Sequence, residues 1–160
     1  MNAAAFFDLV REGNLFAVKQ ALEEDPDLVK QRDPRGSTPL VLAAYYDHAE
    51  VVEYLLEKGA PVDDTDTTGN TALMGACFKG YEASAEVLLK GGADPNAKGP
   101  MGATCLIFAV KFNREAVADL LLEYGADVGA TDAQGHSAVY YARVQGLDSL
   151  AQYLESKAGE

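Results

Sequence analysis

The sequence has no tryptophan, only two histidines and only two cysteines among its 160 residues. Two cysteines are too few for the disulfide framework of a small secreted domain. No apolar run approaches the roughly 20 residues that a membrane-spanning helix requires. The first eleven residues lack the basic start and the long apolar stretch of a secretory signal. We therefore expect a soluble, cytoplasmic protein that has no membrane partner.

Basic residues are also scarce, because 13 Lys and Arg stand against 25 Asp and Glu, which gives a formal net charge of −12. A protein with this charge is repelled by the phosphate backbone of nucleic acids and by anionic lipid surfaces. We therefore expect no nucleic-acid partner. Hydrophobic residues make up 48% of the chain, which is enough for a continuous core and excludes a disordered chain.

The sequence repeats with a period of 33 residues. Glycine, alanine and leucine each recur at this spacing, at Gly36, Gly69, Gly102 and Gly135, at Ala43, Ala76, Ala109 and Ala142, and at Leu55, Leu88, Leu121 and Leu154. Such a period indicates stacked units that share one core. It predicts a single domain with full units at 33–65, 66–98 and 99–131, an N-terminal capping unit at 1–32 and a C-terminal capping unit at 132–160. We expect these five units to form a complete array.

Each unit predicts two short helices joined by a tight turn. A hydroxyl residue stands where each first helix begins and can accept hydrogen bonds from its free N–H groups; these residues are Thr38, Thr71, Thr104 and Ser137. Residue types that adopt a left-handed backbone follow the first helix, at Asp47, Gly80, Asn113 and Gly146. An apolar stripe that includes Leu88 and Leu121 marks the second helix. We therefore expect ten helices in five pairs and essentially no strand.

This pattern resembles that of the ankyrin-repeat family over residues 33–157. In the first full unit the matching residues are Asp33, Gly36, Thr38-Pro39-Leu40, Ala43-Ala44, Leu55-Leu56 and Gly59-Ala60. The resemblance implies an all-α solenoid of stacked helix–turn–helix units with the turn tips on one side. One departure is that Val41, Met74, Ile107 and Tyr140 replace the histidine that hydrogen-bonds across repeats in the family. We therefore expect apolar packing to carry more of the coupling between units.

The resemblance also implies a binding surface. Ankyrin-repeat proteins bind other proteins through a concave groove made by the turn tips and the exposed side of the first helices. The corresponding residues are Arg35, Tyr45, Tyr46, Phe78, Lys79, Met101, Lys111, Phe112, Val144 and Gln145. Exposed aromatic residues are typical of binding hot spots. The basic residues among them suit a partner segment that carries carboxylates and apolar anchors.

The sequence predicts no catalytic residue, no metal site and no cofactor. His48 and His136 lie more than two units apart, so they cannot share a site, and we interpret both as structural or solvated. Cys77 and Cys105 fall in neighbouring units, near each other but beyond the reach of a disulfide, and we expect two buried thiols. The glycines at 91–102 precede no Gly-Lys-Ser/Thr sequence, so they do not indicate a phosphate loop.

We therefore predict a non-catalytic protein-binding module, monomeric on its own, that acts as an adaptor, a protector or an inhibitor of its partner. Two alternatives stay open. One is an enzyme with an unrecognised site. The other is an inhibitor of a basic toxin that binds the acidic outer face, which is made by Glu50, Glu53, Glu57, Glu82, Glu86, Glu115, Asp119 and Glu123 of the second helices.

Overall fold

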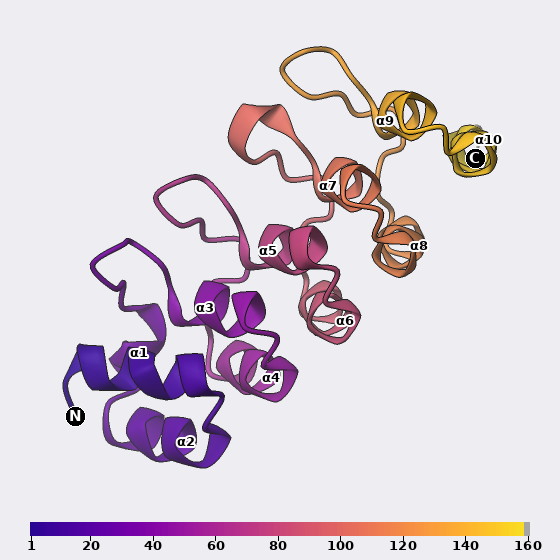
Figure 1. Ribbon diagram of the computed structural model, residues 1–160. Helices are drawn as coiled ribbons and strands as arrows, with labels where there is room; N and C mark the ends of the chain where they lie inside the picture. Colours follow the sequence, from indigo (N-terminus) through magenta and orange to yellow (C-terminus); the bar gives the residue numbers. More distant parts are fainter. Residues whose placement is uncertain (159–160) are drawn as a thin grey trace.

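The computed structural model describes residues 1–158 as a row of helix pairs, with the N- and C-termini at opposite ends (Figure 1). Ten α-helices lie in this part of the chain. It contains no strand, and one isolated bridge joins Thr131 to Ser137. The all-α prediction is therefore confirmed.

The helices form two rows (Figure 1). The inner row consists of α1 (Ala3–Glu12), α3 (Pro39–Tyr45), α5 (Ala72–Lys79), α7 (Cys105–Lys111) and α9 (Ala138–Val144). The outer row consists of α2 (Leu15–Glu24), α4 (Ala49–Glu57), α6 (Glu82–Lys90), α8 (Glu115–Glu123) and α10 (Asp148–Ala158). Loops project from the inner row, and their ends at 33–37, 66–70, 99–103 and 132–136 are the turn tips. Two short 3-10 helices, η1 (Pro26–Lys30) and η2 (Pro100–Gly102), complete the chain.

The predicted helix boundaries have the expected chemistry. The Thr71 side chain caps α5 by accepting a hydrogen bond from the Met74 N–H at 3.2 Å, and Thr38, Thr104 and Ser137 cap α3, α7 and α9 in the same way. The residues after the inner helices adopt a left-handed backbone, with φ of 58° at Asp47 and 57° at Asn113. Each inner helix therefore starts and stops where its own sequence directs it.

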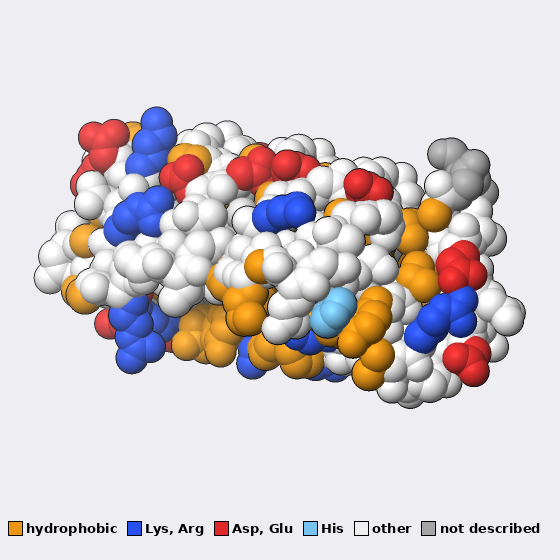
Figure 2. Space-filling view, turned by 90° about the horizontal axis from the view of Figure 1, so that it is seen from above, with side chains coloured by type: hydrophobic (Ala, Val, Ile, Leu, Met, Phe, Trp, Pro, Cys, Tyr) orange, Lys and Arg blue, Asp and Glu red, His pale blue; other side chains and the backbone are white. Residues whose placement is uncertain are grey.

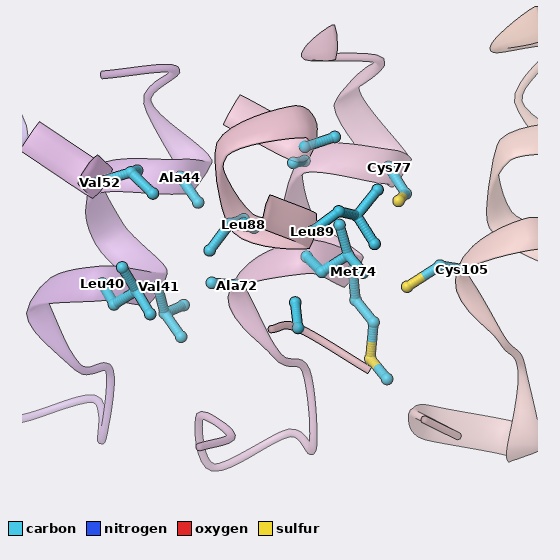
Figure 3. Close-up of a cluster of buried hydrophobic side chains, with 14 of the residues drawn as sticks. Leu40, Val41, Ala44, Val52, Ala72, Met74, Cys77, Leu88, Leu89 and Cys105 are labelled. Carbon is cyan, nitrogen blue, oxygen red and sulfur yellow. The ribbon is translucent and has the colours of Figure 1, made fainter. Parts of the chain in front are cut away.

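The core runs without a break along the array. Leu55, Leu88, Leu121 and Leu154 of the outer helices are all 0% exposed. Each of α3, α5 and α7 packs against the next inner helix, and α4, α6 and α8 pack in the same order. Figure 3 shows this packing, with small residues such as Ala44 and Ala72 between larger ones. The predicted core stripe is confirmed.

Cys77 and Cys105 are free, fully buried thiols between α5 and α7 (Figure 3). Burial raises the pKa of the Cys77 thiol well above its ordinary value, and the neighbouring Cys105 thiol raises it further. A thiol with a raised pKa is a poor nucleophile. The two cysteines are therefore core residues, as predicted.

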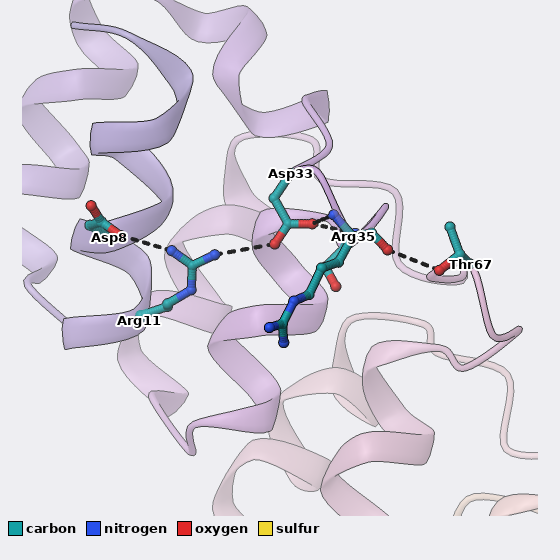
Figure 4. A network of polar contacts seen from close by, with 6 residues as sticks. Asp8, Arg11, Asp33, Arg35 and Thr67 are labelled. Carbon is teal, nitrogen blue, oxygen red and sulfur yellow. Dashed lines mark hydrogen bonds and ion pairs between the residues drawn. The ribbon is translucent and has the colours of Figure 1, made fainter.

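Polar contacts between successive loops also join the units. Arg32 Nη1 donates a hydrogen bond to the Thr65 carbonyl at 2.6 Å, and Lys98 Nζ donates to the Thr131 carbonyl at 2.8 Å. The Thr67 hydroxyl donates to the Arg35 carbonyl at 2.9 Å (Figure 4). Polar contacts therefore couple neighbouring units in addition to apolar packing. These three contacts lie in the loops, away from the helix starts where Val41 and its counterparts replace the family's histidine.

Candidate binding groove

Five predicted site residues form a continuous cluster at the ends of the inner helices. The rings of Tyr45 and Tyr46 meet edge to face at 5.3 Å, and those of Phe78 and Phe112 at 4.5 Å. Lys79 connects the two pairs, because its Nζ lies 4.8 Å from the centre of the Tyr45 ring and 6.0 Å from that of Phe78. The four aromatic side chains are between 40% and 45% exposed. We name these five residues the aromatic row.

Helix geometry explains why part of this row faces solvent. Tyr45 and Phe78 each follow a fully buried alanine by two residues, namely Ala43 and Ala76. Two residues correspond to about 200° around an α-helix, so the side chains point away from the core. The same alanine column that allows neighbouring inner helices to pack closely therefore turns these rings outward.

A pocket of about 420 Å³ lies beside the aromatic row and is named here the central pocket. From the inner helices it is lined by Tyr45, Met74, Gly75, Phe78, Phe108, Lys111 and Tyr141. From the loops and their tips it is lined by Asp66, Asn70, Pro100, Met101, Ala103, Asp132 and Gln134. The structure thus brings four predicted residues, Tyr45, Phe78, Met101 and Lys111, to one pocket.

The sequence prediction missed three residues that line the central pocket from one column of the repeat. They are Gly75, Phe108 and Tyr141, which share this column of the 33-residue period with Leu42. A Cβ added to Gly75 has no neighbouring atom within 4 Å, and its φ is not in the left-handed region. A glycine inside a helix costs about 1 kcal/mol relative to alanine. Neither backbone nor packing requires glycine here, and its effect is to leave the pocket open. A glycine in an otherwise large-residue column was the signal available in the sequence.

A second hollow, of about 480 Å³, is also lined by Tyr45 and is named here the side hollow. Its lining residues are Arg11, Asp33, Arg35, Ser37, Leu42, Tyr45, Tyr46 and Asp66. Arg11 bridges the carboxylates of Asp8 at 2.8 Å and Asp33 at 3.2 Å (Figure 4). The two hollows share Tyr45 and Asp66, so they lie next to each other along the inner helices and the turn tips, and we refer to them together as the groove.

The charges of the groove differ from the predicted cationic surface. Lys79 lies over the Tyr45 ring, and the Nζ of Lys111 lies 5.0 Å from the centre of the Tyr141 ring. A cation over an aromatic face is attracted to the ring. Asp66 and Asp132 add carboxylates to the same pocket. The groove therefore mixes both signs, and its two central lysines already have partners within the chain.

At the C-terminal end of the groove, Val144 is 65% exposed, and Gln145 ties α9 to α7 by donating a hydrogen bond from Nε2 to the Lys111 carbonyl at 3.1 Å. The Tyr141 hydroxyl donates a hydrogen bond to Asp132 Oδ2. This bond raises the pKa of Tyr141 to about 12 and lowers the pKa of Asp132. These contacts join α9 to α7 and to the last turn tip at this end of the groove.

The acidic residues of the outer helices lie at the surface, and all eight are exposed except the half-buried Glu86. The Glu86 carboxylate forms an ion pair with Lys90, with 3.1 Å between Oε1 and Nζ. The view from above, on the side opposite the outer row of Figure 1, shows other acidic side chains along the upper edge of the molecule and hydrophobic side chains along its lower edge (Figure 2). The molecule therefore offers a second surface, of different chemistry from the groove.

Neither histidine belongs to a cluster of metal-binding type. His48 donates a hydrogen bond from Nε2 to the Arg11 carbonyl at 2.7 Å, and the His136 ring stacks on Tyr140 at 3.8 Å. Among residues 1–158, no three His, Cys, Asp or Glu side chains are placed to hold a metal ion together. No helix in this same part of the chain is long and apolar enough to cross a membrane.

Sequence comparisons agree with this architecture. The family model described as ankyrin repeats (3 copies) matches residues 2–99 and 88–159. Ankyrin repeat and SAM domain-containing protein 6 of Mus musculus is 40% identical over 57 residues, which are 36% of this chain and 6% of that protein. DNA-binding protein RFXANK of Homo sapiens is 35% identical over 60 residues, which are 38% of this chain and 23% of that protein. The chain thus spans less than a quarter of the length of either relative. With its helix pairs, capped inner helices and 33-residue period, the chain belongs to the ankyrin-repeat family.

Proposed function

We propose that this chain binds a partner protein through the aromatic row and the central pocket, without catalysing a reaction. Ankyrin repeats are general protein-interaction modules, and the family is typically non-catalytic. The observation that carries the proposal is the contiguous row of half-exposed aromatic side chains beside the central pocket. The role in the cell is that of an adaptor, a protector or an inhibitor of the partner.

The energetics of association support this surface. Large aromatic side chains with few rotatable bonds bury much area at a small entropic cost. Here the rings already touch one another and Lys79, so little ordering remains to be done on binding. The central pocket can accept an anchoring side chain of the partner, as hot-spot pockets do.

We propose a protein rather than a nucleic acid as the partner. One relative is named a DNA-binding protein, but it is 35% identical over 60 residues only. The net charge of −12 opposes binding to a phosphate backbone. Two free thiols fit a reducing compartment, so the proposal includes a cytoplasmic location.

The test is capture of the partner from a cell extract, with the wild-type chain and two sets of variants. Replacing two ring anchors, Tyr46→Ala with Phe112→Ala, should weaken binding at least about tenfold, because a buried aromatic anchor typically contributes 2 kcal/mol or more. The matched control replaces Glu53, Glu86 and Asp119 of the outer face by glutamine. It should retain the partner, and circular dichroism should show that both proteins are folded.

The opposite result would favour the acidic outer face and a basic partner, such as a toxin. In that case the outer-face variant loses the partner and the groove variant retains it. Binding through exposed carboxylates would also weaken steeply with salt, because charges at the surface are screened beyond about 8–10 Å at physiological ionic strength.

A further inference from the structure

Three turn tips of the array begin with an aspartate at the same position of the repeat: Asp33, Asp66 and Asp132. In each, Oδ1 accepts hydrogen bonds from the backbone N–H groups two and four residues later, at 2.9–3.0 Å. This oxygen shapes the tip. The other carboxylate oxygen, Oδ2, is then available for a different partner.

The Oδ2 atoms of two of these aspartates are already engaged. Asp33 Oδ2 accepts a hydrogen bond from Arg11 Nη2 at 3.2 Å, and Asp132 Oδ2 accepts one from the Tyr141 hydroxyl. Among the described residues, no hydrogen bond or ion pair involves Oδ2 of Asp66. The reason is visible in the repeat: Tyr141 stands nine residues after Asp132, and Gly75 stands nine residues after Asp66. The second full unit therefore lacks the side chain that satisfies the aspartate in the last unit.

The space above Gly75 is the central pocket, and Asp66 lines it together with Met74, Phe78 and Pro100. Asp66 also lines the side hollow, so this residue borders both hollows. Of the other charged residues that line the central pocket, Asp132 is hydrogen-bonded to Tyr141, and Lys111 lies over the Tyr141 ring. Apolar and aromatic walls with an unpaired oxygen on Asp66 suit a long side chain with an apolar stem and a cationic end. Arginine fits best, because its planar guanidinium stacks on aromatic rings and donates to carboxylates in a fixed geometry.

We propose that the central pocket binds an arginine side chain of the partner protein, whose guanidinium donates to Oδ2 of Asp66 while its stem packs over Gly75. This inference rests on the proposed function and names the chemistry of the partner segment. It differs from the carboxylate-bearing partner expected from the sequence, because Lys79 and Lys111 already lie over tyrosine rings. The charged side chains that line the central pocket are two carboxylates, Asp66 and Asp132, and one ammonium group, Lys111, so charge complementarity favours a cation.

A basic residue of the chain itself does not occupy this position. Arg35 lines the side hollow with Asp66 and is exposed. Within residues 1–158 no ion pair joins the two side chains. The other arginine that lines the side hollow, Arg11, is already paired with Asp8 and Asp33, so Arg35 is the competitor to test. An Arg35→Gln variant should bind an added arginine at least as well as the wild type.

Two substitutions test the site from opposite sides. Gly75→Tyr should place a phenol above Asp66, as Tyr141 does above Asp132, and so fill the pocket without disturbing the fold. Asp66→Asn keeps an oxygen for the N–H groups of the tip but removes the negative charge. Gly75→Ala is the matched control, because a methyl group there meets no neighbour and leaves most of the pocket open.

The probe is N-acetyl-arginine methylamide, titrated into the isotope-labelled full-length chain and followed by nuclear magnetic resonance. The corresponding citrulline amide, which is neutral and has nearly the same shape, is titrated in parallel. We expect amide shifts at Asp66 and Gly75 with the arginine probe, and binding of the citrulline probe weaker by about tenfold, as for the loss of a charge-assisted hydrogen bond. Gly75→Tyr and Asp66→Asn should abolish the response, and Gly75→Ala should retain it.

Equal responses to arginine and citrulline, or no shift at the pocket, would overturn the inference. The partner captured in the preceding experiment separates this failure from failure of the proposed function. A partner that is lost with Tyr46→Ala and Phe112→Ala, yet still binds Gly75→Tyr and Asp66→Asn, leaves the groove as the binding surface and refutes the arginine site. A partner that still binds the Tyr46→Ala and Phe112→Ala variant refutes the proposed function itself.

Discussion

Two columns of the repeat show how differently the inside and the groove of this array are built. The buried column consists of four leucines, Leu55, Leu88, Leu121 and Leu154, each 0% exposed. The groove column consists of Leu42, Gly75, Phe108 and Tyr141, which differ in every unit. Both columns recur with the same period and lie on equally regular helices.

The difference follows from what surrounds each column. A residue of the buried column packs against neighbouring units at close-packed density, so only one volume fits. In the groove column, Gly75, Phe108 and Tyr141 line the central pocket and Leu42 lines the side hollow, so the size of this residue varies from glycine to tyrosine along the groove. The buried column therefore determines stability, and the groove column determines which shapes and charges the surface offers.

The largest expected effect comes from shortening a leucine side chain of the buried column. Leu88→Ala and Leu121→Ala should each lower the free energy of unfolding by roughly 2–5 kcal/mol, because each leaves a cavity in a fully buried site. Leu154→Ala, in the last unit, should cost less because that unit has a neighbour on one side only. Urea denaturation measures all three. An unchanged midpoint for Leu88→Ala would show that the column does not hold the units together.

An intermediate effect is expected at the helix starts. Thr71→Ala should cost about 1 kcal/mol of stability, because the N–H of Met74 loses the hydroxyl that accepts its hydrogen bond at 3.2 Å. Thr71→Ser keeps the hydroxyl and serves as the control, with a much smaller loss. Equal losses for alanine and serine would assign the effect to packing of the threonine methyl group instead.

A substitution in the groove column should increase stability, whereas the substitutions above decrease it. Gly75→Ala should raise the free energy of unfolding by up to about 1 kcal/mol, since alanine is the better helix former and its methyl group meets open space. Gly80→Ala is the contrasting case. Its φ of 76° and the Arg114 side chain 2.6 Å from an added Cβ should make that variant less stable. Thermal unfolding of both variants would show whether the groove column is free of packing constraints.

The smallest effect concerns the C-terminal end of the groove and appears only at high pH. The pKa of Tyr141 is raised to about 12 by its hydrogen bond to Asp132, against an ordinary value of about 10. Its stabilising contribution is therefore complete below about pH 10 and is lost as the pH rises to about 12. The stability difference between the wild type and Tyr141→Phe should shrink across this range. A constant difference would indicate that the bond to Asp132 does not form in solution.

Much of this architecture could be predicted from the sequence, because it follows from local chemistry. The helix starts depend on threonine hydroxyls next to their own backbone, and the helix ends depend on residues that tolerate a positive φ. The leucine column recurs because the packing environment at this position is the same in every unit. The aromatic row was also predicted, since Tyr45 and Phe78 stand at fixed positions relative to the buried alanines.

The pocket itself could not be predicted in the same way. Asp33, Asp66 and Asp132 look equivalent in the sequence, and the short-range bonds of their Oδ1 atoms are the same. What distinguishes them is the partner of Oδ2, and in the two satisfied cases that partner comes from a helix rather than from the tip. From the sequence alone, Gly75 appears only as a glycine that destabilises its helix, and its role in forming the pocket is visible only in the structure.

The sequence alone thus determined the period, the helices, the caps and the buried leucines, because each depends on residues that are close along the chain or on a packing environment repeated in every unit. Only the tertiary structure decided which charges remain unpaired. Lys79 and Lys111 meet tyrosine rings of neighbouring helices, and Asp66 faces the space that Gly75 leaves open. These outcomes depend on distances between side chains from different units, which no local pattern specifies.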